Sequence, residues 1–580
     1  MKASNKKVTV AEYIANFVTT LGVDTIPFVQ GGVIMKIIDF VGQNKKLKYI
    51  ASNHEQAVAM FVDGYARIKG FGVGMATSGP GGTNMATGIA CAYYDSIPCL
   101  FVTGQVGMFH VKGNKHVRQR GFQETDIVSM MAPITKYAVM LEKAEDVRYI
   151  FEKAVYLAKS GRPGPVLIDV PYNVQREFVD PGTLHAFNPD VEGEKISPVS
   201  SSDVDEIVKE LSRAIRPVLL MGGGVRIADQ AKTALALADL LKIPIISTWG
   251  AVDIFPSTYP LYLGTPGRYG NISANDIALK SDLVLALGAR FSTKVVYNDK
   301  IFAKDTKVIA IDVDRGELEE GLLTHYKTIV ADLRDFMPRF ITKMKGLRTS
   351  SSERTSWQNE AKKLKSESFE INVPPPSDVK NHVSPYALLG ALSEVLGTED
   401  IITSDCGLNL VWSVQGYKSK GGNQRFLSAW GNSPMGYSFP AAIGVHFARP
   451  RALSVCLIGD GGMQMNIQEL QTVFKNKVPI KIFILNNYCY GMMMLNKPEF
   501  NGRTYGNNPE TGYEAPDFVA VAKAYKIKSV FLKNDKNIEV SVKKILAMKG
   551  PVLINVNLHP DQNIYDAVIA AKQSPPPKTK

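Results

Sequence analysis

The sequence of 580 residues has little cysteine and no long apolar run. Its five cysteines (Cys91, Cys99, Cys406, Cys456 and Cys489) form no Cys-x-x-Cys pair, so we expect neither a disulfide framework nor a zinc site. No apolar stretch approaches the roughly 20 residues that span a bilayer. The basic N-terminus also lacks an apolar signal region with a cleavage site. These absences predict a cytoplasmic protein with no membrane partner.

Charge of one sign is in excess, with a formal net charge of +12. The lysines and arginines are spread along the chain and no nucleic-acid-binding motif accompanies them. We therefore expect no nucleic acid partner, and a solvated, lysine-rich surface explains the charge.

Short apolar runs alternate with stretches of helical periodicity along the whole chain. Continuous apolar runs are typical of strands that are buried on both faces of a parallel sheet. They occur at 218–224, 283–291, 308–314, 454–460 and 480–487. Polar breaks rich in Ser, Lys or Pro occupy 189–203 and 345–385. The sequence thus predicts an α/β protein with three doubly wound parallel-sheet (Rossmann-like) domains over 1–188, 200–345 and 381–560, a linker over 346–380 and a tail over 561–580.

An acidic GDG turn and an Asn-Asn pair follow two successive predicted strands. Asp460 and Asn487 should therefore lie together at the carboxyl ends of parallel strands, where such sheets open their ligand crevice. One carboxylate, one amide oxygen and a nearby backbone carbonyl are ligands that Mg²⁺ accepts together with phosphate oxygens. Gly461 and Gly462 would let the chain approach those phosphates. A lone GDG would be an ordinary turn, but this arrangement predicts a diphosphate cofactor bound through magnesium.

The GDG turn and the Asn-Asn pair, with strand, helix and strand between them, resemble the thiamine diphosphate (ThDP) enzymes. The similarity extends over 53–67, 77–106, 121–138, 160–171, 435–444 and 459–470, which look like acetolactate synthase (acetohydroxyacid synthase) catalytic subunits. This resemblance implies a pyrimidine-binding (PYR) domain at 1–188, a central FAD-like nucleotide domain at 200–345 and a diphosphate-binding (PP) domain at 381–560. It also implies a homodimer or homotetramer, with the PYR domain of one subunit facing the PP domain of another.

The resemblance further assigns roles to individual residues. Glu55 matches the glutamate that activates the aminopyrimidine ring, and Phe122 and Gln123 match residues that face the substrate. Met435 matches the residue that supports the bent cofactor. The expected metal ligands are Asp460, Asn487 and the carbonyl of Cys489. The expected cofactor-binding set is Gly32, Glu55, Cys406, Asn409, Met435, Asp460, Gly461, Gly462, Asn487, Cys489, Tyr490, Gly491 and Met492.

The central domain resembles the flavin site of that family. The matching residues are Arg162, Gly222, Gly223, Gly224, Arg290, Asp312 and Asp332. A glycine-rich turn after a strand suits a nucleotide phosphate. Relatives bind FAD, ADP or nothing here, so FAD in a structural role is one of three open readings.

Four departures from acetolactate synthases concern the acceptor of the reaction. Tyr172 replaces a lysine, Arg268 and Tyr269 replace a Met-His pair, and Asn496 replaces a tryptophan. The fourth is the basic loop, residues 107–121, which is longer than in those synthases. It carries Lys112, Lys115, Arg118 and Arg120 with His110 and His116.

These departures lead to three hypotheses. The main one is a carboligase that decarboxylates a 2-oxo acid, expected to be pyruvate, and transfers the acyl unit to a carbonyl acceptor such as an anionic keto-sugar. Lys115, Arg118, Arg120, Arg268 and Asn496 would then contact the acceptor, although a solvated loop explains the charge of 107–121 equally well. The alternative is acetolactate synthase proper, in branched-chain amino acid synthesis. The third, a non-catalytic regulatory subunit, predicts the loss of Glu55 or of a metal ligand, and neither is lost.

Overall fold

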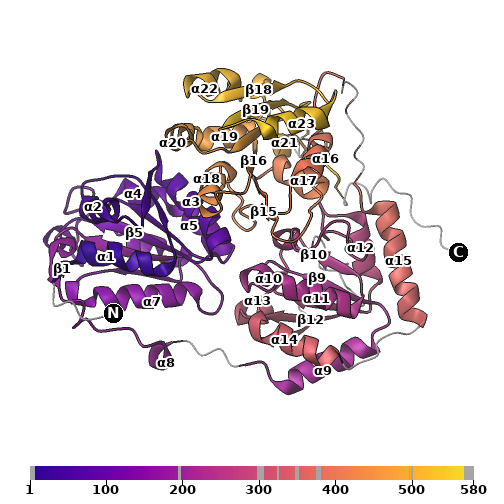
Figure 1. The fold of residues 1–580 in the computed structure, drawn as a ribbon, viewed down its shortest axis with the longest axis horizontal. Helices are drawn as coiled ribbons and strands as arrows, with labels where there is room; N and C mark the ends of the chain where they lie inside the picture. Colours follow the sequence, from indigo (N-terminus) through magenta and orange to yellow (C-terminus); the bar gives the residue numbers. More distant parts are fainter. Residues whose placement is uncertain are drawn as a thin grey trace.

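The computed structural model of the chain describes residues 7–193, 198–296, 306–322, 326–345, 352–371, 373, 376, 380–495, 497 and 501–566. These residues build three α/β domains, each around its own parallel sheet (Figure 1). The parallel sheets that the sequence predicts are confirmed. Within the described part of the chain, no helix combines the length and the apolar character needed to cross a membrane.

The N-terminal sheet has six parallel strands in the order β3-β2-β4-β5-β7-β6. Its strands are β2 (Thr25–Phe28), β3 (Lys48–Ala51), β4 (Gly72–Ala76), β5 (Cys99–Gln105), β6 (Tyr137–Met140) and β7 (Val166–Pro171). Its helices are α1 (Val10–Val18), α2 (Met35–Gln43), α3 (Glu55–Lys69), α4 (Pro80–Asn84), α5 (Ala86–Tyr94), α6 (Ile127–Met131) and α7 (Val147–Lys159). Both faces of β5 are buried, since Leu100 packs in a cluster with α1, α2 and α7 and Phe101 in another with α5 and α6. A small antiparallel pair, β1 (Val8–Thr9) and β8 (Phe178–Val179), lies beside this sheet.

The central sheet has five parallel strands in the order β10-β9-β11-β12-β13. Its strands are β9 (Pro217–Met221), β10 (Ile245–Ser247), β11 (Leu283–Leu287), β12 (Lys307–Asp312) and β13 (Tyr326–Val330). Its helices are α9 (Ser201–Arg213), α10 (Gly224–Ile227), α11 (Ala231–Leu241), α12 (Ile272–Lys280), α13 (Arg315–Glu319) and α14 (Leu333–Met344), and the short α8 (Pro189–Glu192) precedes them.

The C-terminal sheet has six parallel strands in the order β15-β14-β16-β17-β19-β18. Its strands are β14 (Ile401–Ser404), β15 (Arg425–Leu427), β16 (Ser454–Gly459), β17 (Lys481–Asn486), β18 (Lys528–Leu532) and β19 (Val552–Asn557). Its helices are α16 (Pro385–Val395), α17 (Leu408–Gly416), α18 (Ser438–Ala448), α19 (Asp460–Met465), α20 (Leu470–Asn476), α21 (Gly491–Leu495), α22 (Phe518–Ala524) and α23 (Ile538–Ala547).

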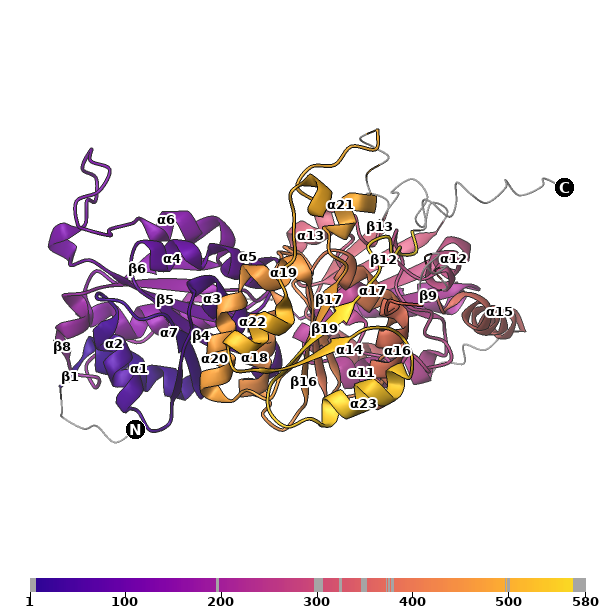
Figure 2. The same cartoon turned by 90° about the horizontal axis from the view of Figure 1, so that it is seen from above.

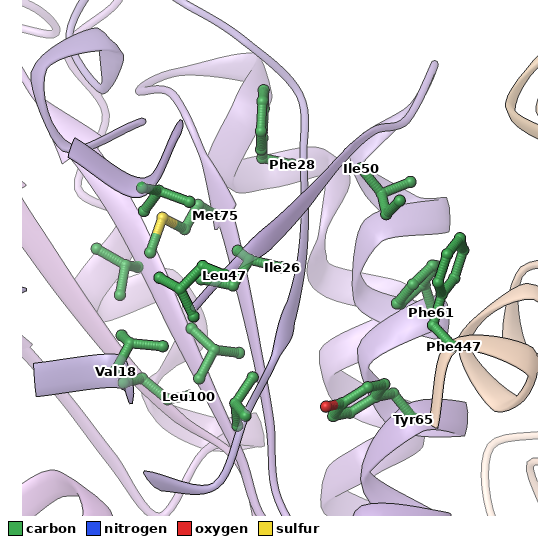
Figure 3. Packing of buried hydrophobic residues seen from close by; sticks show 14 of the residues in the cluster. Val18, Ile26, Phe28, Leu47, Ile50, Phe61, Tyr65, Met75, Leu100 and Phe447 are labelled. Atoms are coloured by element: carbon green, nitrogen blue, oxygen red, sulfur yellow. The ribbon is translucent and has the colours of Figure 1, made fainter. Parts of the chain in front are cut away.

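Helices α3 and α18 join the N-terminal domain to the C-terminal domain (Figures 1 and 2). A Cβ atom built on Gly64 of α3 would lie 2.4 Å from the Ala441 carbonyl oxygen, so the two backbones nearly touch. Phe61 and Phe447 stack beside this contact with ring centroids 5.6 Å apart (Figure 3). Glycine at the crossing permits a close approach that a larger side chain would block.

The segment expected as a linker contains a long helix, α15 (Ser352–Ser368). This helix packs against the central domain, where Trp357 is buried and its Nε1 donates to the Pro217 carbonyl at 3.0 Å. The mostly polar composition of 352–368 hides this contact, because only a narrow face of the helix is apolar.

Candidate active site

Asp460 and Asn487 lie at the same edge of the C-terminal sheet. Strands β16 and β17 are parallel neighbours, with Gly459 opposite Leu485, and the two polar residues follow directly after these strands. The sequence suggests a Gly-Gly turn after β16, whereas in the structure helix α19 begins at Asp460 itself. The strand ends therefore bring the two side chains to one crevice, as expected for a doubly wound sheet.

Asp460 is a buried carboxylate with one oxygen that has no hydrogen-bond partner. One oxygen accepts a hydrogen bond from the Gly461 amide at 3.0 Å, while Oδ2 is buried without a hydrogen-bond partner. Burial raises the pKa of Asp460 to about 7, although the nearby Tyr513 hydroxyl partly offsets this effect. A buried carboxylate oxygen without a donor is costly, and a bound cation would relieve that cost.

Asn487 supplies a second oxygen at this edge. Its Nδ2 donates to the Cys489 sulfur at 3.2 Å, which fixes the orientation of the amide and leaves Oδ1 for another partner. The donor set of one carboxylate and one amide oxygen fits Mg²⁺ better than a softer metal.

Glycines let three segments meet around these side chains. A Cβ on Gly461 would lie 2.3 Å from the Tyr490 ring, and one on Gly462 would lie 2.0 Å from Asp405 Oδ2. A Cβ on Gly491 would lie 2.7 Å from Asn487 Nδ2. The GDG helix, the loop after β14 and the start of α21 therefore form one cradle whose size depends on glycine.

Asp405 and Asn409 connect this cradle to the segment that contains Met435. Asp405 is buried and accepts hydrogen bonds from the amides of Gly436 at 3.0 Å and Ser438 at 3.1 Å. Burial raises its pKa to about 6. Asn409 donates to the Leu457 carbonyl at 3.1 Å, and its own Oδ1 is buried without a partner. Met435 itself is half-buried at the mouth of this region, as are Cys406 and Met492.

The N-terminal domain gathers a second group of predicted residues. Glu55 is the first residue of α3 and is 8% exposed, and its Oε2 accepts a hydrogen bond from Asn84 at 2.9 Å. Gln123 has a φ of +62°, and a Cβ on Gly79 would lie 2.9 Å from its carbonyl oxygen. Phe122 points outward and is 87% exposed. Such exposure of a large apolar ring is unusual unless a ligand or another chain covers it.

The basic loop, residues 107–121, is organised by one carboxylate. Glu124 is buried and accepts hydrogen bonds from three backbone amides, those of Lys112, Arg120 (2.7 Å) and Gly121 (3.2 Å). These hydrogen bonds favour the charged form and hold the pKa of Glu124 below its usual range, against the opposing effect of burial. The cations at 115, 118 and 120 are exposed. The loop is therefore an ordered structure that presents its charges to solvent.

A cavity of about 630 Å³ lies where the three domains meet. Six of the seven residues of the predicted flavin set line it: Arg162, Gly223, Gly224, Arg290, Asp312 and Asp332. The seventh, Gly222, lies directly behind, because its Cβ would be 1.8 Å from the Gly288 carbonyl oxygen. Arg162 reaches across from the N-terminal domain to Asp314 and Glu317, each at 2.8 Å. This cavity is large enough for a nucleotide and has a glycine-rich turn beside it.

Other predicted acceptor residues lie apart from the basic loop. Arg268, in the central domain, forms an ion pair with Asp566 at 2.9 Å. Tyr172 accepts a hydrogen bond from Arg176, whose guanidinium lies over its ring. Asn496 lies outside the described residues. Gly32 is exposed, in the loop after β2.

Sequence reasoning missed four residues of these groups: Asn84, Glu124, Asp405 and Tyr513. Asn84 is 29 residues from the glutamate that it contacts, and Tyr513 is far along the chain from Asp460. An isolated polar residue gives no signal of a contact over such separations. Asn84 lies within 77–106, one of the stretches that resemble acetolactate synthases, but the resemblance assigned no role to it.

Comparisons with known proteins show the family of the chain. Three family models match: "Thiamine pyrophosphate enzyme, N-terminal TPP binding domain" at 8–130, the central domain at 204–340 and the "C-terminal TPP binding domain" at 405–556. The chain is 34% identical to the acetolactate synthase large subunit of Porphyra purpurea, over 94% of this chain and 91% of that protein. It is 31% identical to the acetolactate synthase isozyme 1 large subunit of Escherichia coli (strain K12), over 98% and 97%. A probable acetolactate synthase large subunit of Methanocaldococcus jannaschii is 32% identical, over 95% and 92%. The chain therefore belongs to the thiamine diphosphate-dependent enzymes and is acetolactate synthase-like.

Proposed function

We propose that this enzyme decarboxylates a 2-oxo acid, with pyruvate as the donor, and joins the acyl unit to a second carbonyl compound. The observation that carries the proposal is the buried, unpartnered Asp460 Oδ2 beside Asn487 at the end of two parallel strands. This pair would bind Mg²⁺ together with the carbonyl of Cys489, and the metal would bind the cofactor diphosphate. ThDP supplies the electron sink for decarboxylation when it is bound.

The chain's own residues would orient this chemistry. Gly461, Gly462 and Gly491 would leave room for the diphosphate, and Met435 would contact the cofactor. The Asn84 amide donates to the Glu55 carboxylate at 2.9 Å and would orient it to hydrogen-bond a ring nitrogen of the cofactor's aminopyrimidine. Phe122 and Gln123 would enclose the substrate and exclude water.

We propose that the active site is completed by a second copy of the chain, in a homodimer or a homotetramer. Glu55 and Phe122 belong to the N-terminal domain, while Asp460 and Asn487 belong to the C-terminal domain. The 87% exposure of Phe122 supports a surface that a second subunit covers.

A second 2-oxo acid is the acceptor that the relatives' names favour, which makes the acetolactate synthase reaction the first candidate. The expectation of an anionic keto-sugar finds no support in those names. It stays a second candidate for one reason: the basic loop is held in shape by buried Glu124 and presents Lys115, Arg118 and Arg120 to solvent. Arginines and lysines presented on an ordered loop suit a phosphate-bearing acceptor.

We also propose that the central cavity binds a dinucleotide such as FAD in a structural role. The cavity volume, the Gly223–Gly224 turn and Arg162 support it. Flavin absorbance of the purified protein would indicate FAD. Bound ADP without flavin absorbance would indicate ADP, and the absence of both would indicate an empty cavity.

The test of the acceptor is to incubate the enzyme with ThDP, Mg²⁺ and pyruvate, alone and with a nucleotide-linked keto-sugar. Acetolactate formed from pyruvate alone supports the first candidate. Pyruvate consumption that requires the keto-sugar supports the second. Glu55→Gln, as the control variant, should nearly abolish turnover in both reactions, and an unchanged rate would refute the role given to Glu55.

A further inference from the structure

A short segment of the C-terminal domain, residues 429–437, carries Met435 and is called here the Met435 segment. It runs from the end of β15 to the start of α18 and has no regular secondary structure. Buried carboxylates nevertheless hold it near both ends, and two of them, Asp63 and Asp95, belong to the N-terminal domain. Two neighbouring amides, those of Trp430 and Gly431, each donate to Asp95 at 2.8 Å.

Glycine at 431 makes this contact possible. A Cβ at this position would lie 2.7 Å from Tyr94 Cβ and 3.2 Å from Asp95 Oδ1. The segment therefore rests directly on the turn after α5, and the two carboxylate oxygens of Asp95 are matched to two consecutive N–H groups.

The other end of the segment is held by one side-chain and one backbone hydrogen bond. The Tyr437 hydroxyl donates to Asp63 of α3, and the Gly436 amide donates to Asp405 at 3.0 Å. Met435 lies between these fixed points and is itself only half-buried. Its position therefore depends on the anchors at the two ends of the segment.

A single guanidinium connects the two N-terminal anchors. Arg67 Nε lies 2.6 Å from Asp63 and its Nη2 lies 2.6 Å from Asp95. The three side chains are 5%, 0% and 5% exposed, so water screens these charges little. Removing one member of such a buried network costs more than removing an exposed ion pair.

The same residues also line the central cavity. Arg67, Asp95, Trp430 and Gly431 face it together with the Gly223–Gly224 turn. A ligand in the cavity that contacts these residues in their ordered arrangement stabilises that arrangement. By linkage, it then improves any binding event that needs the same arrangement.

We propose that Asp95, fixed by Arg67, is a positioning residue that holds the Met435 segment in its cofactor-binding position and transmits occupancy of the central cavity to it. The second part rests on the proposed nucleotide in that cavity. The first part rests on the hydrogen bonds and on the cofactor contact proposed for Met435.

The test is Asp95→Asn, with ThDP binding measured by calorimetry at saturating Mg²⁺. Asparagine keeps the size of the side chain but turns an NH₂ group toward one of the two backbone amides, which leaves that amide unsatisfied. We expect the dissociation constant of ThDP to rise about tenfold, the effect of roughly 1.4 kcal/mol. Asp282→Asn is the matched control, since Asp282 also accepts two backbone amides, those of Ile215 at 2.7 Å and Arg216 at 2.9 Å, away from the Met435 segment.

Transmission is tested by measuring the same constant with and without saturating FAD. In the wild type we expect FAD to tighten ThDP binding several-fold, and in Asp95→Asn we expect this ratio to approach one. Tyr437→Phe removes the hydrogen bond to Asp63 at the other end with little change of volume, and it gives a second variant should Asp95→Asn fold poorly. Wild-type ThDP affinity in both variants would overturn the positioning role. FAD that binds the wild type without changing ThDP affinity would overturn the transmission, whereas failure of FAD to bind would instead refute the proposed nucleotide site.

Discussion

Replacing Gly444 with alanine should force apart the two helices that join the N-terminal and C-terminal domains. The new Cβ would lie 2.1 Å from the Phe61 carbonyl oxygen and 3.1 Å from the Tyr65 nitrogen. Both are backbone atoms of α3, so no rotamer change relieves the clash. Helix α3 also cannot retreat freely, because Gly88 of α5 packs against Ala59 on it. Overpacking costs about 1–3 kcal/mol, and a backbone clash belongs at the upper end of that range.

Alanine itself favours a helix over glycine by about 1 kcal/mol. The net effect of Gly444→Ala is therefore a destabilisation of about 2 kcal/mol. Gly390→Ala in α16 is the matched control, because a Cβ there meets nothing within 4 Å and the same substitution should stabilise by about 1 kcal/mol. We expect the apparent unfolding midpoints of the two variants, followed by circular dichroism under one set of conditions, to shift in opposite directions. Midpoints are compared, and not free energies of unfolding, because a protein with three domains need not unfold in two states. A Gly444→Ala protein as stable as Gly390→Ala would refute the close crossing of α3 and α18.

Three further predictions concern single carboxyl groups. Asp460→Asn should reduce Mg²⁺-dependent ThDP binding at least tenfold by calorimetry, and addition of EDTA should weaken the wild type in the same way while leaving the variant nearly unchanged. Glu124→Gln should loosen the basic loop and make it a site of rapid tryptic cleavage between Lys112 and Arg120, whereas an uncleaved loop would contradict its dependence on Glu124. Burial raises the pKa of Glu469 from 4.5 to about 7, so the stability that this group contributes is present below its ordinary pKa and is lost as the pH rises toward 7. Glu469→Gln is neutral at every pH and should flatten that decline, which unfolding midpoints at pH 5 and pH 8 would detect.

The parallel strands and the Asp460–Asn487 pair could be predicted because their signals are local. A continuous apolar run indicates a buried strand, and a polar residue directly after it must lie at the sheet edge. The packing of helix α15 could not be predicted in this way, because one of its buried side chains is a charged residue. Arg354 is buried against the end of α9, where it donates to the Leu211 and Ala214 carbonyls. A burial of this kind depends on backbone groups that are distant in the sequence.

The supporting carboxylates were missed for the same reason. Glu124 and Asp95 act by accepting hydrogen bonds from backbone amides. Almost every residue has such an amide, so no sequence pattern shows which amide a carboxylate contacts. Asp95 is separated by 335 residues from Trp430, whose amide it accepts. Predicting such residues requires the fold, because the fold alone determines which turn lies under which loop.

The contacts of the residues that differ from the synthases reduce the number of residues that could contact the acceptor. Arg268 and Tyr269 replace a Met-His pair of the synthases, and in the structure both belong to an attachment of the C-terminal segment. Arg268 pairs with Asp566 at 2.9 Å, while the Gln415 amide donates to the Tyr269 carbonyl at 3.0 Å and to the Tyr565 carbonyl at 2.9 Å. The Arg268 departure is therefore explained by the path of the chain near 565, whereas Tyr269 is held there through its backbone carbonyl, which any residue supplies. The basic loop has no such explanation, because its cations at 115, 118 and 120 are exposed, while backbone amides on Glu124 and the Gln119 side chain, which donates to the Glu124 carbonyl at 2.9 Å, hold its shape. A change of acceptor relative to the synthases would then act through 107–121 or through the side chains at 172, 269 and 496. If it acts through the basic loop, neutralising Lys115, Arg118 and Arg120 together should weaken the binding of an anionic acceptor while leaving turnover of pyruvate alone unchanged.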